Sequence, residues 1–395
     1  MLPLKGIKVL DLSRLLPGPL ATLVLADLGA DVDKVEDTSG GDYLRVMPPH
    51  AGSGGRGDGS PDATSSIFLA LNRNKRSVVI DLKKPKGKDA LLRLARCYDV
   101  VLEQFRPGVL DRLGLSHATL LAENPRLVVC ALTGYGQTGP LALRAGHDLN
   151  YLARAGVLGM QGPEGGPPTL PGFQLADVSG GLYAVIGIMG ALMERARTGK
   201  GSIVDVAMIE TAMPFAIAGF GQSFGGQAPK AGGEALVGGI APYQTYATKD
   251  GKAMSLAALE PKFWMAFSSG VGHAVDMSDL VPGSHQVALK EKLRAIFAEK
   301  TRDEWVQFAR DRDCCLEPVL TAEEARVDEH LVARKMFFEM ASKWGPIPMM
   351  RTPLTDVDRE HAPPPAQGEH TDAILREAGV TAEEIAAMRA DGTIR

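Results

Sequence analysis

The chain has 395 residues, of which 45% are hydrophobic and 23% are charged, and its net charge is −4. This composition is typical of a folded globular protein and excludes a largely disordered chain. A pI near 6.1 argues against a basic groove for nucleic acid. The longest apolar run, at 182–193, is shorter than the roughly 20 residues that a membrane span needs. We therefore expect neither a nucleic-acid partner nor a membrane partner.

The N-terminal part of the chain alternates between two kinds of segment. Residues 17–30 and 87–97 have the apolar spacing of helices. Around them, short apolar runs with β-branched residues predict strands at 7–12, 77–82, 99–105 and 126–136, and residues 31–36, with two valines, are predicted as a further strand. This alternation predicts an α/β fold, with a parallel sheet covered by helices.

The segment 48–66 is rich in Gly, Ser and Pro and is expected to be a flexible loop. It contains an RGD tripeptide, which we interpret as part of this loop because the N-terminal stretch lacks the apolar core of a secretory signal. For the same reason we expect a cytoplasmic protein. The four cysteines have no CxxC spacing and no histidines at zinc-site spacing, so we expect reduced thiols and no metal site.

A chain of this length exceeds what one hydrophobic core usually organises, so we expect two domains. The later elements are expected in this order: a helix from 178 to about 197, a strand and then an apolar helix within 202–221, a linker at 225–239, a hairpin about Asp250 and Gly251, an amphipathic helix at 290–314, and a Pro-rich tail ending in two short helices.

The turn after the first strand, "SRLLPGPLAT", stands where dinucleotide-binding proteins carry a Gly-rich loop. It has one glycine where that loop needs three. Pro17 and Pro19 also offer no backbone N–H to a pyrophosphate. The sequence therefore argues against a nicotinamide or flavin cofactor but keeps the sheet.

Basic side chains stand beside the expected third and fourth strands. Arg73, Lys75 and Arg76 precede the third strand, and Arg106 and Arg112 follow the fourth. Because ligands of open α/β sheets bind at the carboxyl ends of strands, we place this cluster near that edge as a candidate phosphate site. A solvated charged face explains the same residues, so both interpretations stay open.

Two further residues are candidates for chemistry. Asp177 directly precedes the long apolar helix, where it is either an N-cap or a carboxylate kept ionised by free N–H groups. Gly180 and Gly181 would let a substrate approach that first turn closely. His147, in "LRAGHDLNY", is either a structural histidine or a catalytic one. Spacing alone does not decide between these alternatives.

Several stretches, in order along nearly the whole chain, resemble the class III CoA-transferase (CaiB/BaiF) family, and most of all its α-methylacyl-CoA racemase branch. The matching stretches are "LKGIKVLDLS", "ADLGADVDKVE", "NRNKRSVVIDLK", "FRPGVLDRLGL", "LTGYGQTGP", "AGHDLNY", "ADVSGGLYAVIGIMGALMERARTGKG" and "TDAILREAGVTAEEIAAMRADG". This resemblance implies an interlocked homodimer with a Rossmann-like large domain and a smaller α/β domain. The domains it implies are a large CoA-binding domain at 1–200, a helical linker at 201–229, the small domain at 230–330, and a linker and tail at 331–395 that return to the large domain.

The resemblance also implies a reaction. It favours an acyl-CoA racemase or epimerase that acts on 2-methyl-branched acyl-CoA thioesters by 1,1-proton transfer through an enolate, with His147 and Asp177 as the acid/base pair. Glu260 would orient His147. The alternative is a class III CoA-transferase that moves CoA between carboxylic acids through an acyl anhydride on Asp177. Transferases of the family tend to carry a tyrosine at the position of His147. A third alternative is a CoA-binding protein without turnover.

The resemblance implies no tightly bound cofactor, because coenzyme A enters as part of the substrate. The residues that it assigns to CoA binding are Asn72, Lys75, Arg76, Gln104, Phe105, Arg106, Arg112, Asp148 and Tyr151.

Overall fold

The computed structural model describes residues 2–51, 64–342 and 345–395. Most of the predicted 48–66 loop, including its RGD tripeptide, lies outside the described residues. Packing divides the chain into two compact units. The first consists of Met1–Leu152, Phe173–Ala212 and Glu329–Arg395, and the second consists of Ala153–Gly172 and Met213–Asp328.

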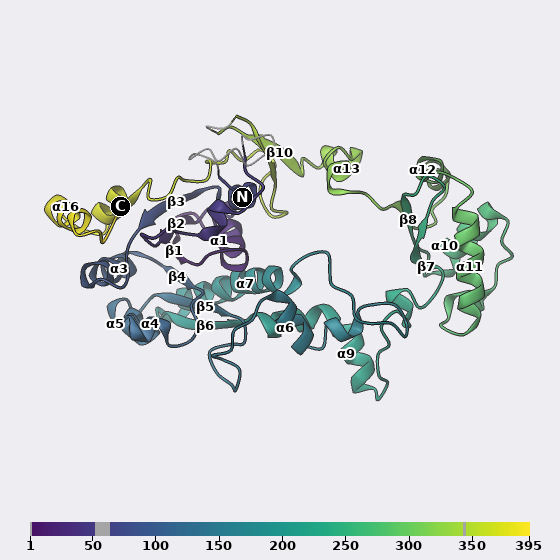
Figure 1. The fold of residues 1–395 in the computed structure, drawn as a ribbon, viewed down its shortest axis with the longest axis horizontal. Helices are drawn as coiled ribbons and strands as arrows, with labels where there is room; N and C mark the ends of the chain where they lie inside the picture. Colours follow the sequence, from purple (N-terminus) through teal and green to yellow (C-terminus); the bar gives the residue numbers. More distant parts are fainter. Residues whose placement is uncertain (1, 52–63, 343–344) are drawn as a thin grey trace. The chain divides into compact units, whose positions relative to one another are not determined.

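A six-stranded parallel sheet forms the centre of the first unit (Figure 1). Its strands are β1 (Lys8–Leu12), β2 (Asp31–Glu36), β3 (Lys75–Val79), β4 (Val100–Glu103), β5 (Val128–Thr133) and β6 (Ser202–Ala207). The order β3-β2-β1-β4-β5-β6 is that of doubly wound nucleotide-binding folds. In these folds the strands stay parallel, but the order in which they are added to the sheet reverses between β1 and β4. The α/β fold and the parallel sheet predicted from the sequence are confirmed.

Helices cover both faces of this sheet. The helices of the first unit before the tail are α1 (Pro17–Asp27), α2 (Ser66–Asn72), α3 (Pro85–Cys97), α4 (Val109–Arg112), α5 (His117–Glu123), α6 (Asp148–Arg154, whose last residues belong to the second unit), α7 (Leu175–Thr198) and α8 (Met208–Ala212). α1 and α7 pack against each other, and α7 also contacts β5 and β6. α3 contacts β1 and α5.

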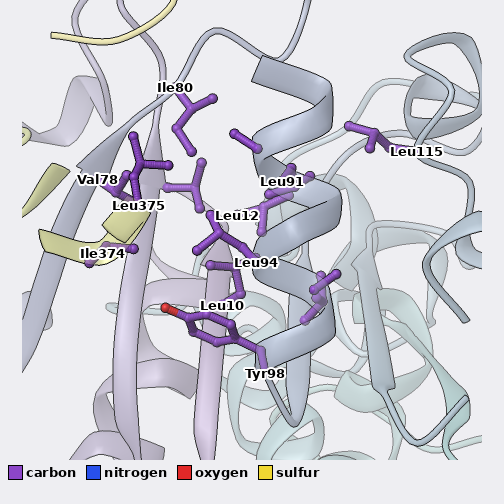
Figure 2. Packing of buried hydrophobic residues seen from close by; sticks show 14 of the residues in the cluster. Leu10, Leu12, Val78, Ile80, Leu91, Leu94, Tyr98, Leu115, Ile374 and Leu375 are labelled. Atoms are coloured by element: carbon purple, nitrogen blue, oxygen red, sulfur yellow. The ribbon is translucent and has the colours of Figure 1, made fainter. Parts of the chain in front are cut away.

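The tail of the chain completes the first unit. It contains α14 (Glu329–Ala333), an antiparallel pair β10 (Phe337–Met340) and β11 (Ile347–Met350), and the two short helices α15 (Thr371–Glu377) and α16 (Ala382–Ala390). Figure 2 shows Leu10 and Leu12 of β1 beside Leu91 and Leu94 of α3, with Ile374 of α15 joining the same cluster. The core of the N-terminal sheet therefore includes side chains from the tail. The pair of short helices was predicted, but the β10–β11 hairpin was not.

α7 is long and apolar enough, by length and composition alone, to cross a membrane. Part of it is buried in the first unit, whereas Ile186 and Met193 are exposed. A Cβ on Gly181 would lie 2.7 Å from the carbonyl oxygen of Pro17 in α1, and one on Gly180 would lie 2.7 Å from Cγ of Met208. The expectation that these glycines admit a substrate is wrong, because both are buried and allow α7 to approach its neighbours closely.

The second unit has its own sheet and aromatic core. Its elements are α9 (Ile217–Phe224), β7 (Tyr243–Ala247), β8 (Ala253–Ala257), α10 (Pro261–Val271), α11 (His285–Phe297), α12 (Arg302–Arg310), β9 (Leu316–Pro318) and α13 (Ala322–Arg326). β7 and β8 form the predicted hairpin about Asp250 and Gly251. Trp264, Phe267 and Trp305 lie in the buried cluster behind this sheet.

The prediction of a single helix at 290–314 is wrong. The chain forms two helices, α11 and α12, because Thr301 starts the second one with a capping box: its side chain accepts from the Glu304 N–H and the Glu304 side chain accepts from the Thr301 N–H. The apolar periodicity continues across the break and hides it in the sequence.

The two units differ in extent from the domains expected at 1–200 and 230–330. The segment 153–172 packs with the second unit, where a Cβ on Gly219 would lie 2.5 Å from the sulfur of Met160. β6, at the start of the expected linker at 201–229, is a strand of the large sheet.

Candidate active site

A cavity of about 780 Å³ opens at the carboxyl ends of the first five strands. Its wall includes Ser13 after β1, Asp37 after β2, Asp81 after β3, Gln104 after β4 and Gly134 after β5. This is the place where open α/β sheets bind their ligands, outside the carboxyl ends of strands on either side of the reversal. The cavity lies wholly within the first unit.

His147 and Asp177 both line this cavity. His147 directly precedes α6, and its backbone N–H donates to Oδ1 of Asn150 at 3.1 Å. Asp177 lies in the first turn of α7 and is partly buried. The two residues that the sequence could not place relative to each other therefore face one cavity.

Asp148 connects the elements that carry these two residues. Its Oδ1 accepts from the backbone N–H of Ala176 at 2.7 Å and of Asp177 at 3.1 Å. α7 begins at Leu175, so the interpretation of Asp177 as an N-cap is wrong, and Asp148 supplies the cap from α6. Asp148 is not among the residues that line the cavity, where the resemblance placed it, because its carboxylate points at the end of α7.

Burial, followed by the negative charge of Asp148, raises the pKa of Asp177 to about 7. This reverses the expectation that free N–H groups keep Asp177 ionised, because Asp148 takes two of those N–H groups and adds its own charge. Near neutral pH the side chain of Asp177 is therefore populated both as an acid and as a base. A carboxyl group in this state can donate or accept a proton at a bound ligand.

Tyr151 fixes the loop that carries His147. Its hydroxyl donates to the carbonyl of Gly146, and its ring meets the ring of Tyr135 edge-on at 5.1 Å. A Cβ on Gly134 or on Gly146 would lie within 2.7 Å of the Tyr151 side chain. The two glycines therefore make room for the ring, which lines the cavity as the resemblance implied.

Four cationic side chains line the cavity: Arg14, Lys83, Arg106 and Arg144. Within the described part of the chain, none of the four forms an ion pair. Arg14 lies over the ring of Tyr43, with its guanidinium carbon 5.4 Å from the ring centre. Unpaired cations around one cavity suit an anionic ligand such as a phosphate.

Sequence reasoning found only one of these cations. Arg106 lines the cavity together with Gln104 and Phe105, as the resemblance implied. Arg14 and Lys83 were missed, although both closely follow a predicted strand and the rule about carboxyl ends would have found them. Arg144 had no signal of its own beyond its place just before His147.

Besides Asp148, four residues assigned to CoA binding lie outside the cavity. Asn72, Lys75 and Arg76 stand at the amino end of β3, which is the opposite edge of a parallel sheet, so the placement of this cluster at the carboxyl edge is corrected. Lys75 is buried and donates to Pro19, Thr22 and Asn72. Arg76 pairs with Asp33 and Glu377 instead. Arg112 is exposed on α4.

Glu260 belongs to the second unit. It occupies the N-cap position of α10, and its side chain makes no capping hydrogen bond there. Its role in orienting His147 stays a prediction.

Comparison with known proteins identifies the family. The sequence profile of CoA-transferase family III matches residues 4–371. The human alpha-methylacyl-CoA racemase is 38% identical over 99% of this chain and 97% of its own length. The human succinyl-CoA:glutarate CoA-transferase is 32% identical over 95% of this chain and 86% of its own length. The crystal structure of a CAIB/BAIF family protein from Brucella suis has a TM-score of 0.81 at 34% identity, covering 95% of this chain and 99% of that one. The chain therefore belongs to CoA-transferase family III, as its motifs predicted.

Proposed function

We propose that the protein is an acyl-CoA racemase or epimerase that inverts a 2-methyl-branched acyl-CoA thioester. The observation that carries this proposal is the pairing of His147 with Asp177 on one cavity, where the pKa of Asp177 is raised to about 7. A group that must serve as base in one direction and as acid in the other works best with a pKa near the working pH. The likeness to the human racemase supports the same reaction.

The cavity suits coenzyme A as the carrier of the acyl group. Coenzyme A has a diphosphate and a ribose phosphate at one end and its thioester at the other. Arg14 and Lys83 line the cavity after β1 and β3, whereas His147 lines it before α6 and Asp177 in the first turn of α7. We propose that the phosphates lie among the cations and that the thioester reaches the acid/base pair.

The chemistry follows from the two side chains. The α-proton of a thioester is only weakly acidic, so its removal needs a positioned base and a stabilised enolate oxygen. One member of the pair takes the α-proton, and the electron pair moves onto the thioester oxygen. The other member then donates a proton to the opposite face of the α-carbon. The two residues exchange roles with the handedness of the substrate.

A CoA-transferase is the second candidate, and Arg144 is the observation that favours it. This unpaired guanidinium lines the cavity close to His147, where the carboxylate of an acceptor acid would need a cation. In that reaction the ionised Asp177 attacks the thioester carbonyl, CoA leaves as its thiolate, and an acyl anhydride forms. The likeness to the human succinyl-CoA:glutarate CoA-transferase supports this alternative.

We further propose a homodimer of interlocked chains in which Glu260 orients His147. The second unit exposes large apolar side chains near its N-terminal helices, including Phe215 at 57%, Ile217 at 65% and Phe224 at 81%. Exposed apolar side chains gathered in one segment are typical of a subunit contact.

Exchange of the α-proton with solvent tests the reaction. Each enantiomer of 2-methylbutanoyl-CoA or a longer 2-methylacyl-CoA is incubated separately in D2O, without an acceptor acid, and deuterium is measured by mass spectrometry. We expect the wild type to incorporate deuterium and invert both enantiomers. Asp177→Asn should stop inversion but leave exchange of the one enantiomer whose proton faces His147, and His147→Asn should leave exchange of the other enantiomer only.

The transferase gives a different result in the same assay. It incorporates no deuterium, moves CoA once a carboxylic acid is added, and loses that transfer in Asp177→Asn while His147→Asn retains it. That pattern would overturn the racemase proposal. Binding of CoA with neither activity over a panel of 2-methylacyl thioesters and acids would overturn both.

A further inference from the structure

A pair formed by a half-buried histidine and a buried carboxylate lies behind the wall of the cavity. Nε2 of His117, the first residue of α5, is 3.0 Å from Oε1 of Glu103, the last residue of β4. The side chain of Glu103 is 3% exposed and that of His117 is 19% exposed. The proposed reaction uses neither residue.

The second carboxylate oxygen of Glu103 holds the turn that follows β4. Its Oε2 accepts from the backbone N–H of Phe105 at 2.7 Å. Gln104, Phe105 and Arg106, which make up this turn, all line the large cavity. Glu103 therefore connects His117 on one side to the wall of the proposed CoA site on the other.

The turn lies between two cavities. The smaller one, of about 170 Å³, is lined by Glu103, His117 and Gln137 among others, and it shares Arg106 and Pro107 with the large cavity. Phe105 packs against the buried cluster of the sheet, whereas Arg106 has open space on both sides. The hydrogen bond from the Phe105 N–H to Glu103 therefore adds to the packing of Phe105 in holding the turn.

We propose that His117 is a positioning residue for the substrate: through Glu103 it holds residues 104–106 in the conformation that binds the CoA part of the thioester, and it does so more firmly as an imidazolium. This inference rests on the proposed function only in taking CoA as the ligand of the cavity. It applies equally to the racemase and to the transferase.

The charges that face His117 determine the sign of its pH dependence. The hydrogen bond to Glu103 raises the pKa of His117, and the charges of Glu103, of Asp111 on α4 and of Asp205 on β6 add to the rise. Arg106 is the cation on the wall of the same small cavity. At low pH the imidazolium forms a charge-assisted bond to Glu103. As pH rises through the raised pKa, the ring still donates from Nε2 but without its charge, so the turn is held less firmly.

Binding of CoA measured by calorimetry from pH 6 to pH 9 tests the inference, with the intact protein. We expect the wild-type Kd to rise about threefold across the titration of His117, since charge-assisted bonds are roughly twice as strong as neutral ones. His117→Gln places an amide nitrogen near Nε2, so it should bind CoA tightly with a pH step about threefold smaller, because Asp177 still titrates in the cavity. His117→Ala should weaken binding about tenfold at every pH, by loss of the bond to a buried carboxylate. In the activity assay KM should rise in the alanine variant while kcat changes little.

His330→Gln is the matched control, because this exposed histidine of α14 lies outside both cavities and should leave the pH step unchanged. Equal CoA affinity in the wild type and in both His117 variants would overturn the inference alone. A pH step of the same size in His117→Gln as in the wild type would also overturn it, by assigning the whole titration to another group. Failure of the wild type to bind CoA at all would overturn the proposed function and the inference together.

Discussion

Asp148 and Asp177 are two carboxylates of one site with different tasks. Asp148 accepts two backbone N–H groups at the start of α7, which stabilise its charge. Asp177 is partly buried, and burial, followed by the charge of Asp148, raises its pKa to about 7. A carboxyl group whose surroundings raise its pKa is a common way to obtain acid/base chemistry at neutral pH. The environment of Asp177 is therefore set by its neighbour as much as by its own position.

Substitutions of Asp148 separate its charge from its capping bond. Asp148→Asn keeps an oxygen for the N–H groups but removes the charge, so the pKa of Asp177 should fall by up to about one unit. kcat/KM for the enantiomer that Asp177 deprotonates rises with pH as Asp177 ionises, so the midpoint of its pH profile should move below 7. Asp148→Ala should shift that profile similarly and also lose about 1 kcal/mol of unfolding free energy with the cap. A midpoint that stays near 7 in Asp148→Asn would contradict the role given to this charge.

The residues of the site differ in how far the sequence could predict them. The motif around His147 and the position of Asp177 were sufficient to name the pair, because the family resemblance carries both. The raised pKa of Asp177 was not predictable, since it depends on a contact with Asp148 on another helix. The prediction that Lys75 lies in the site was wrong. Lys75 is the first residue of β3, so it lies at the amino edge of the parallel sheet, opposite the cavity.

At the scale of elements, α7 holds the site through its contact with α1. A Cβ on Gly181 would meet the backbone oxygen of Pro17, which cannot move aside as a flexible side chain would. Gly181 is buried, whereas Gly190 on the same helix is exposed and has nothing within 4 Å of an added Cβ. The same substitution should therefore have opposite effects at the two positions.

Gly181→Ala should destabilise the protein by about 1–3 kcal/mol through overpacking between α1 and α7. Gly190→Ala, the matched control, should stabilise it by about 0.5–1 kcal/mol, because alanine loses less conformational freedom in a helix. Chemical denaturation of both variants measures these changes. Two variants of equal stability would show that the helices can shift apart at Gly181 without cost.

Helices and strands were predictable wherever the pattern of apolar residues began and ended with the element. β5 lies within the predicted run at 126–136, because a buried parallel strand is a continuous apolar stretch. The break between α11 and α12 was missed because the apolar spacing continues through Thr301. The β10–β11 hairpin was missed because β11 stands in a Pro-rich stretch, which is typical of extended chain.

At the scale of the whole molecule, the proposed dimer makes a simple prediction. Light scattering after size exclusion should give twice the 41.9 kDa of one chain, and the mass should not fall on dilution, because interlocked chains cannot separate without unfolding. Phe215→Ser combined with Phe224→Ser removes exposed apolar side chains that we place in the contact. We expect this double variant to lose dimer yield, measured by the same method. A wild-type mass of one chain at micromolar concentration would contradict the proposal.

The tail that completes the core of the first unit has a consequence for the order of folding. Leu10 and Ile374 lie in one buried cluster, and Ile80 pairs with Ile394, although the whole second unit separates them in the chain. Contacts between residues so distant in sequence form slowly, because a long loop has to close first. The second unit consists mainly of the continuous stretch Met213–Asp328, so its contacts are more local. Refolding should therefore begin in the second unit and end with the tail joining the sheet, and until then the apolar faces of β1 and β3 are open to misassociation.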